Sequence, residues 1–195
     1  MCENSASFWK GSNTSKVAFV FECPGQEEEN QSKPVAGQTG ENLNIVLDFL
    51  VNYCSKKSLF HSIDRYDYRI LNLSEKVYYK AKNGRTIPLI RDIRPDKNIN
   101  RIIEQIGECD TVIFFNKSKK YDKVMNKIQN KLNNKKIIRV RHLGFQSINS
   151  GIKEDKDGKL LVKGQPGNTE KRLEIIACQI VKLIKKKCSK SNSDS

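Results

Sequence analysis

The chain has 195 residues, of which 37% are hydrophobic and 30% are charged, a mix that is typical of one soluble globular domain with a substantial core. No apolar run approaches the roughly 18 residues that span a membrane, and the N-terminus lacks the basic and then apolar pattern of a signal peptide. We therefore exclude a membrane-spanning protein and expect a cytoplasmic one.

The formal net charge of +14 results from 36 lysines and arginines against 22 acidic residues, with most of the excess downstream of Lys117. Such an excess attracts polyanions, of which DNA and RNA are the commonest in a cytoplasm. The alternative is that an AT-rich genome favours lysine codons and that the lysines are only solubilising charges. Charge by itself favours a nucleic-acid partner.

Apolar runs and helical stripes alternate along the chain. Buried strands are predicted at residues 17–21, 69–73, 111–115 and 136–140, and amphipathic helices at 41–54, 98–106, 117–132 and 170–186. Strands that alternate with helices indicate a parallel sheet that is covered on both faces. We predict an α/β fold, a three-layer α/β/α sandwich with a central four-stranded parallel sheet, in a single domain of residues 1–187.

Three segments lie outside this alternation. Residues 78–95 contain the turn signal Asn83-Gly84 between short extended pieces, which indicates a hairpin. Residues 151–167 are rich in Lys, Asp and Gly and predict a loop or a hairpin. Residues 188–195 predict a disordered C-terminal tail.

The cysteines do not form a recognisable ligand set. No two of them are two or three residues apart, so the chain has no CxxC pair for zinc or iron–sulfur ligation. We expect free thiols in a reducing compartment, and neither a metal nor an organic cofactor. The six cysteines are Cys2, Cys23, Cys54, Cys109, Cys178 and Cys188.

The most informative stretch, residues 17–43, is a buried strand that returns through a loop to a helix. The strand stops at Glu22-Cys23-Pro24-Gly25, an acidic loop follows, and Pro34, Gly37 and Gly40 precede the helix. Open α/β folds bind ligands at the sheet edge where such strands end. Glycines at a helix entrance let backbone N–H groups approach a phosphate or a planar base. We expect this stretch to form the floor of a binding site.

This stretch resembles the first motif of the uracil-DNA glycosylase superfamily, most closely that of its thermostable bacterial and archaeal branch. The matching pieces are Glu22-Cys23-Pro24-Gly25, Glu27-Glu28-Glu29, Pro34-Val35-Ala36-Gly37 and Gly40-Glu41-Asn42-Leu43. Tyr68-Arg69-Ile70-Leu71-Asn72-Leu73 is similar to the family's strand that ends in Asn, and Val140-Arg141-His142-Leu143-Gly144 to its strand that ends in His. The family's iron–sulfur cluster is not expected, because Ser74-Glu75-Lys76-Val77 stands where a ligating cysteine would be.

The resemblance implies a monofunctional DNA glycosylase that flips a base from DNA and hydrolyses its N-glycosidic bond, with uracil as the default base. It assigns Glu22 to the attacking water and His142 to the departing base as catalytic residues. Asn72 would read the base, because a carboxamide places an acceptor beside a donor and so matches N3–H and O4 of uracil but not cytosine. The remaining base-binding residues would be Cys23, Pro24, Gly25 and Val35.

The resemblance also implies a DNA-binding surface around the pocket. In it, Phe145 would fill the gap left by the flipped base, the alternative being a buried anchor under its loop. Apart from the resemblance, we expect backbone amides at helix starts to hold phosphates. The protein is expected to be a monomer that binds single- or double-stranded DNA. The DNA-binding residues implied are Gln38, Thr39, Gly40, Asn116, Lys117, Ser118, Leu143, Gly144 and Phe145.

Three residues depart from the family pattern and leave alternatives open. Cys23 replaces the Asp of the most active branch, Val35 replaces an aromatic residue that stacks on the base, and Phe21 replaces a Gly. One alternative is excision of another deaminated or modified base, and a second is a nucleic-acid-binding protein of the same fold without catalysis. Outside the motif, Asn72 reads as a turn former and His142 as a capping or surface residue.

Overall fold

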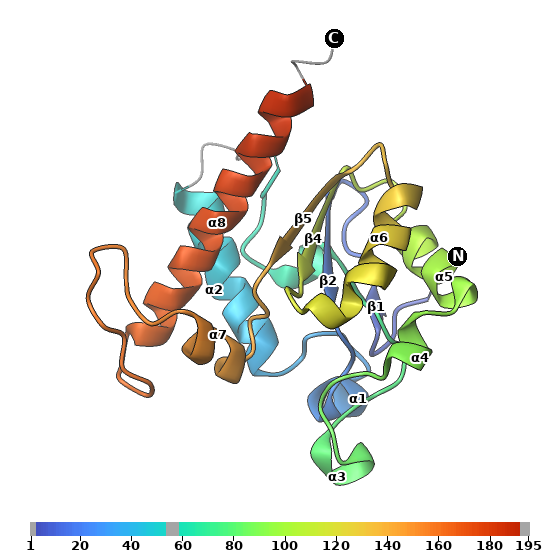
Figure 1. Cartoon of the computed structure of the whole chain (residues 1–195), viewed down its shortest axis with the longest axis horizontal. Helices are drawn as coiled ribbons and strands as arrows, with labels where there is room; N and C mark the ends of the chain where they lie inside the picture. The colour runs from blue at the N-terminus through green and yellow to red at the C-terminus, as the bar shows by residue number, and fades with distance from the viewer. Residues whose placement is uncertain (1–2, 54–58, 192–195) are drawn as a thin grey trace.

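The protein is described by a computed structural model for residues 3–53 and 59–191. Within these residues five strands form one sheet in the order β1-β3-β2-β4-β5 (Figure 1). Strands β3, β2, β4 and β5 run parallel to one another, whereas the edge strand β1 is antiparallel to β3. The strands are β1 (Phe8–Trp9), β2 (Val17–Phe21), β3 (Arg69–Asn72), β4 (Thr111–Phe115) and β5 (Lys136–Val140).

The prediction of a four-stranded parallel sheet is wrong in two respects: the sheet has a fifth strand, and this edge strand is antiparallel to its neighbour. The fifth strand, β1, pairs Phe8 with Leu71 and Trp9 with Ile70. A strand of two residues is too short to show the alternation by which a strand is recognised in a sequence. The fold is therefore α/β with a five-stranded mixed sheet that helices flank.

One face of the sheet is covered by the helices α2 (Gln38–Tyr53), α7 (Phe145–Gly151) and α8 (Asn168–Ser191). The apolar stripe of α2, with Leu43 and Leu47, joins Leu173 and Ile176 of α8 and the β2 side chain Phe19 in one buried cluster. Because every residue of β2 and β4 is buried, both strands read as continuous apolar runs.

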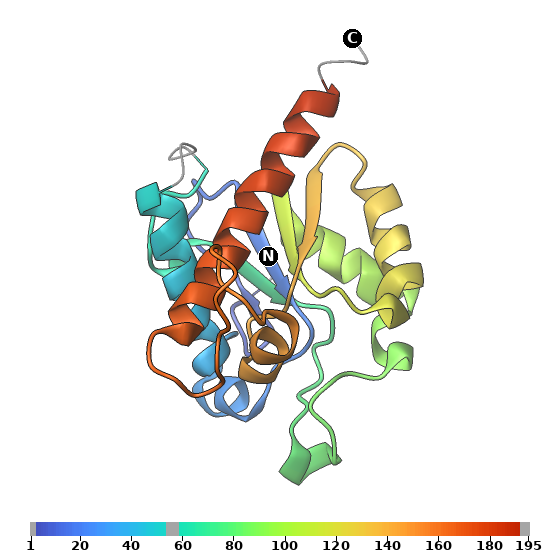
Figure 2. The same ribbon diagram turned by 60° about the vertical axis from the view of Figure 1, so that its left-hand side comes forward.

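The opposite face is covered by α5 (Asp96–Ile106) and α6 (Asp122–Lys131), as Figure 2 shows. Ile99 and Ile102 of α5 and Val124 of α6 pack there in a second buried cluster with Val112 of β4. The predicted helix at 117–132 is shorter than expected, since a 3₁₀ turn, η2 (Lys119–Tyr121), precedes α6. A further 3₁₀ turn, η1 (Arg65–Asp67), leads into β3.

The predicted acidic loop after β2 contains a helix, α1 (Gln26–Gln31). The Glu28 carboxylate accepts the backbone N–H of Gly25 (2.8 Å), which caps the helix start. Glu27, Glu28 and Glu29 occupy its first turn, where negative charge interacts favourably with the helix dipole. A short acidic sequence therefore forms a helix because its charges lie at the favourable end.

The predicted hairpin at 78–95 is wrong. The connection from β3 to α5, residues 73–95, which we call the β3–α5 arm, holds two short helices, α3 (Lys80–Asn83) and α4 (Ile90–Ile93). Gly84 adopts a φ of 68° and ends α3 in the left-handed conformation. The Asn-Gly pair thus ends a helix instead of turning a hairpin, and α3 projects beyond the sheet (Figure 1).

The segment 151–167 is a loop with one antiparallel bridge between Glu154 and Leu160, as predicted. Arg172, which is 1% exposed, supports it from beneath by donating to the carbonyls of Ile152 (3.0 Å) and Leu161. Helix α8 continues to Ser191, into the stretch predicted as a disordered tail, and residues 192–195 lie outside the described residues. No helix in the described ranges is long and apolar enough to cross a membrane.

Candidate functional site

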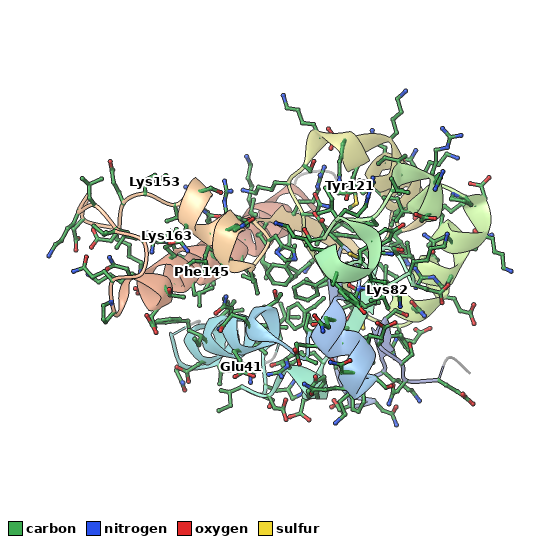
Figure 3. The ribbon with its side chains drawn as sticks, turned by 90° about the horizontal axis from the view of Figure 1, so that it is seen from below. Glu41, Lys82, Tyr121, Phe145, Lys153 and Lys163 are labelled. Atoms are coloured by element: carbon green, nitrogen blue, oxygen red, sulfur yellow. The ribbon has the colours of Figure 1, made fainter. Side chains whose placement is uncertain are left out.

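A cavity of about 560 Å³ lies at the carboxyl edge of the sheet. It is bounded by the end of β2, the start of α2, helix α7 and the β3–α5 arm. Figure 3 views this edge from below, with Phe145 of α7 on one side and Lys82 of α3 on the other. The predicted site residues that line this cavity are Glu22, Cys23, Gly25, Val35, Thr39, Asn72, His142, Gly144 and Phe145.

Asn72 is held by its backbone and left free at its side chain. Its N–H donates to the carbonyl of Ser7 (3.0 Å), and its carbonyl accepts from Arg101 (3.0 Å). The residue is 1% exposed, yet neither Oδ1 nor Nδ2 has a hydrogen-bond partner among the described residues. A buried polar group without a partner costs about 1–3 kcal/mol, so such a side chain indicates a site for a ligand. Asn72 pairs with Phe21 as the last residue of β3 and so lies at a strand end.

His142 lines the cavity and binds its own chain through one ring nitrogen. Its Nδ1 accepts the backbone N–H of Gly144 (2.9 Å), and the edge of the Phe21 ring lies beside it, with the ring centroids 6.0 Å apart. Burial lowers its pKa to about 4, so the imidazole is neutral at neutral pH. A neutral imidazole with Nδ1 as acceptor carries its hydrogen on Nε2. His142 is therefore an uncharged hydrogen-bond donor.

Glu22 is held by a side chain from β4's end. Nδ2 of Asn116 donates to Oε1 of Glu22 (2.8 Å), while Oδ1 of Asn116 accepts the backbone N–H of Ser118 (2.7 Å). This second bond sets the orientation of the amide, and Asn116 is only 2% exposed. Burial raises the pKa of Glu22, whereas the nearby positive charge of Lys120 lowers it. The carboxylate therefore has a fixed position and an elevated basicity.

At the two helix starts where phosphate contacts are predicted, several polar groups already have partners within the protein. The side chain of Asn116 is committed to Glu22, and the N–H of Ser118 is committed to Asn116. At the start of α2, the N–H of Gly40 bonds to the carbonyl of Gly37 (2.8 Å), and Gln38 donates to Asn42 (3.3 Å). The backbone N–H groups of Ser118 and Gly40 therefore already have acceptors within the protein.

Cys23 is a neutral thiol. Burial, and to a lesser degree the carboxylates of Glu22 and Glu28, raises its pKa to about 12. Its Sγ donates to the carbonyl of Thr86, with 3.7 Å between the two atoms. A thiol with this pKa is neither a nucleophile nor a general base at neutral pH.

Val35 and Gly40 form part of the floor through a close backbone contact. Val35 is 4% exposed, with a φ of 46°, and belongs to the buried cluster under α2. A Cβ on Gly40 would lie 1.7 Å from the Val35 carbonyl oxygen, so only glycine permits this approach. Beside the floor, the carbonyl of Pro24 accepts the N–H of Tyr78 (2.9 Å), and Pro24 itself does not line the cavity.

Of the predicted residues after His142, only Phe145 presents an exposed side chain. Phe145 is the first residue of α7, is 41% exposed and has Nζ of Lys163 5.4 Å from its ring centroid. Leu143 is fully buried, and its carbonyl accepts from Asn42 (2.7 Å). The expected DNA contact of Leu143 is therefore wrong, because its side chain is part of the core.

The β3–α5 arm supplies lining residues that the sequence analysis missed. They are Tyr78, Tyr79, Thr86 and Ile87, and Glu28, Gln146 and Ser147 complete the set that was not expected. Two adjacent tyrosines in this connection were the available signal, but the segment was interpreted as a hairpin.

Lys117 is exposed after β4, at the same edge of the sheet, and does not line the cavity. Among the described residues no group of three or more His, Cys, Asp or Glu side chains is arranged to hold a metal ion. Cys23, Cys109 and Cys178 are free thiols. Cys2 and Cys54 lie outside the described residues, as does the side chain of Cys188.

Neither of two comparisons with known proteins finds a match, one made against protein-family models and one against curated proteins.

Proposed function

We propose that this protein is a DNA glycosylase that removes a flipped-out base, with uracil as the default substrate, and leaves an abasic site. One observation carries the proposal. The buried, unpartnered carboxamide of Asn72 lines the same cavity as the neutral His142 and the carboxylate of Glu22. The motif resemblance to the uracil-DNA glycosylase superfamily assigns base reading, leaving-group stabilisation and water activation to these same three residues.

Asn72 reads the base. Its Oδ1 accepts N3–H of uracil and its Nδ2 donates to O4, which satisfies both orphaned atoms at once. Cytosine presents an acceptor and a donor in the opposite order and would leave both pairs mismatched. Sites built to pair a buried polar group discriminate strongly, because the wrong ligand leaves that group unpaired.

His142 and Glu22 divide the chemistry. A water oxygen attacks the anomeric carbon C1′ as the N1–C1′ bond breaks, and the bonding electron pair stays on the departing base. His142 donates from Nε2–H to O2, where negative charge grows, and one such donor is worth about 10²–10³ in rate. The carboxylate of Glu22 accepts the proton of the attacking water. The products are an abasic sugar and the free base, which takes up a proton.

The surroundings fit a nucleic-acid partner. Lys117, Lys119 and Lys120 are exposed at the edge of the sheet that holds the cavity, and Phe145 stands exposed at the rim. The lysines supply phosphate contacts at this edge. Phe145 occupies the duplex in place of the extruded base.

A second candidate function is nucleic-acid binding without catalysis. The observation that favours it is Cys23, whose pKa of about 12 leaves Glu22 as the sole carboxylate base of the motif. This protein would bind DNA and release no base. Excision assays separate the two functions.

The test is single-turnover excision of uracil from matched single- and double-stranded oligonucleotides by the wild type and by Asn72→Leu. We expect at least about a tenfold loss in the variant, because leucine shares the branched shape of Asn, with a larger volume, but has no base-reading edge. The melting temperature of Asn72→Leu should equal or exceed that of the wild type, since the substitution removes an unpaired polar group.

Asn42→Leu is the matched control for stability. Asn42 is also 1% exposed, but its Nδ2 is paired with the carbonyl of Leu143 (2.7 Å). This variant should melt at a lower temperature than the wild type. Wild-type excision by Asn72→Leu would disprove the site assignment, and a wild type that releases no base would leave the binding function in its place.

A further inference from the structure

The cavity has a wall that comes from the β3–α5 arm, and its aromatic members are Tyr78 and Tyr79. Tyr78 is 7% exposed, and its ring is largely covered by the protein. Tyr79 is half-buried, so part of its ring is accessible from the cavity that it lines. Phe21, also in the lining, is 2% exposed and stacks on Phe115 with the ring centroids 4.7 Å apart. Phe115 thus already covers one face of the Phe21 ring, and the residue leaves little surface for a ligand.

Both tyrosine rings are held in place by a carboxylate that also binds a lysine. The hydroxyl of Tyr79 donates to Oε2 of Glu29 (3.1 Å), and Lys82 pairs with Oε1 of the same residue. Tyr78 donates to Oδ2 of Asp92, and Lys76 pairs with Oδ1 of Asp92 (2.6 Å). A ring that is fixed at its hydroxyl loses little conformational entropy when a ligand packs against it.

The arm is docked on the β2–α1 segment that carries Glu22. The N–H of Tyr78 donates to Pro24 (2.9 Å), and the thiol of Cys23 donates to Thr86. The Lys82–Glu29 pair joins α3 to α1, which lie side by side in Figures 1 and 3. These contacts place the Tyr79 ring in the cavity that also contains the unpaired edge of Asn72.

We propose that Tyr79 is the stacking platform of the site and that its ligand is a planar nucleobase with adjacent N–H and C=O groups. The carboxamide of Asn72 reads that edge, while the face of the base lies on the tyrosine ring. Uracil presents this edge at N3–H and O4, and hypoxanthine presents it at N1–H and O6. Tyr78 is a positioning residue that anchors the arm. The inference rests on the proposed function and names the groups that recognise its base.

The test uses free bases, which require no catalysis. Free uracil and free hypoxanthine are titrated with the wild type, Tyr79→Phe and Tyr79→Leu, and the proton resonances of the base are followed. In the wild type and Tyr79→Phe, the ring current should shift uracil H5 and H6 upfield. In Tyr79→Leu that shift should vanish, and the affinity should fall by about fivefold to a hundredfold, the range found for loss of one base–aromatic stack.

Tyr66→Leu is the matched control, because Tyr66 packs on Trp9 and does not line the cavity. It should bind both bases as the wild type does. Wild-type affinity in Tyr79→Leu, or no upfield shift with the wild type itself, would overturn the stacking role, and the second measurement does not depend on how a variant folds. Binding of free uracil with the expected shift, but no excision from DNA, would refute the proposed function and leave the stacking role intact.

Discussion

Three buried asparagines show how the same side chain serves different ends. Asn42 pairs with the carbonyl of Leu143 and joins α2 to the segment before α7. Asn116 pairs with both Glu22 and the N–H of Ser118 and so orients a carboxylate. The side chain of Asn72 has no hydrogen-bond partner among the described residues, although it is as deeply buried as Asn42. Because an orphaned amide lowers stability, its presence at the cavity is best explained by ligand recognition.

The hydrogen bond from Asn116 stabilises the ionised form of Glu22, which burial disfavours. As a base, Glu22 works above its pKa, so excision should rise with pH through that pKa. Asn116→Leu removes the donor and raises the pKa further. We expect the acid limb of kcat/KM against pH to move up by about one to two pH units, the equivalent of one hydrogen bond to a charged group.

His142 does not obscure this limb, because its pKa of about 4 keeps it neutral across the range. Ser118→Ala is the matched control, since Asn116 accepts from the backbone N–H of Ser118 and not from its hydroxyl. Its profile should overlay that of the wild type. An unmoved acid limb in Asn116→Leu would show that Asn116 has no influence on Glu22.

At the scale of elements, the site depends on how connections pack on one another. Helix α1 ties its start to the loop before α2, because Glu28 accepts from both Gly25 (2.8 Å) and Gly37 (3.4 Å). Helix α2 then begins against the carbonyl of Val35, beside Gly40. The β3–α5 arm packs on the β2–α1 segment through the contacts of Tyr78 with Pro24 and of Tyr79 with Glu29.

Gly40→Ala tests the contact between α2 and this floor. Its Cβ would meet the Val35 carbonyl at 1.7 Å and Nε of Arg65 at 2.8 Å, so the backbone must shift. Overpacking of this kind costs about 1–3 kcal/mol, and we expect the melting temperature to fall by about 3–10 °C. Differential scanning calorimetry measures it. Gly84→Asn is the control, since nothing lies within 4 Å of a Cβ there and Asn tolerates a positive φ; equal losses in both variants would contradict the steric argument.

At the scale of the molecule, the charge of +14 is useful to a DNA-binding protein only where it faces the site. Lys117, Lys119 and Lys120 lie on the connection that follows β4, at the carboxyl edge of the sheet. Lysines of α6 have partners elsewhere, as Lys127 pairs with Asp96 (3.2 Å) and Lys131 with Asn100 (2.8 Å). The three lysines after β4 and the three lysines of α6, Lys123, Lys127 and Lys131, therefore carry equal charge at different places on the protein.

This arrangement predicts that replacing Lys117, Lys119 and Lys120 with Gln weakens DNA binding in a salt-dependent way. The slope of log Kobs against log salt should become shallower by about two to three, because each lost phosphate contact removes about 0.7–0.9. Fluorescence anisotropy at several salt concentrations measures the slope. Replacing Lys123, Lys127 and Lys131 changes the net charge equally and should leave the slope nearly unchanged; equal effects would indicate a diffuse field instead of a defined contact.

The sequence by itself determined the strands β2 and β4, because their nearly unbroken apolar runs are typical of strands covered on both faces. It also predicted β5, although that strand contains Lys136 and Arg139. It also placed Asn72 and His142 in one cavity, since the carboxyl ends of parallel strands meet at one edge. Local capping and turn chemistry were less decisive. Asn83-Gly84 fits a hairpin and a helix end equally well in the sequence, and α3 ends there.

Only the tertiary structure decided which side chains are free and which are used. Asn116 and Ser118 look like surface ligands in the sequence, but Asn116 donates to Glu22, 94 positions away in the chain, and the N–H of Ser118 donates to Asn116. Tyr79 enters the site because Glu29, on a different helix, holds its hydroxyl. Periodicity reports which face of an element is buried, whereas hydrogen-bond partners distant in sequence depend on how the elements pack. The path of the β3–α5 arm, and with it the aromatic wall of the cavity, is fixed by those partners.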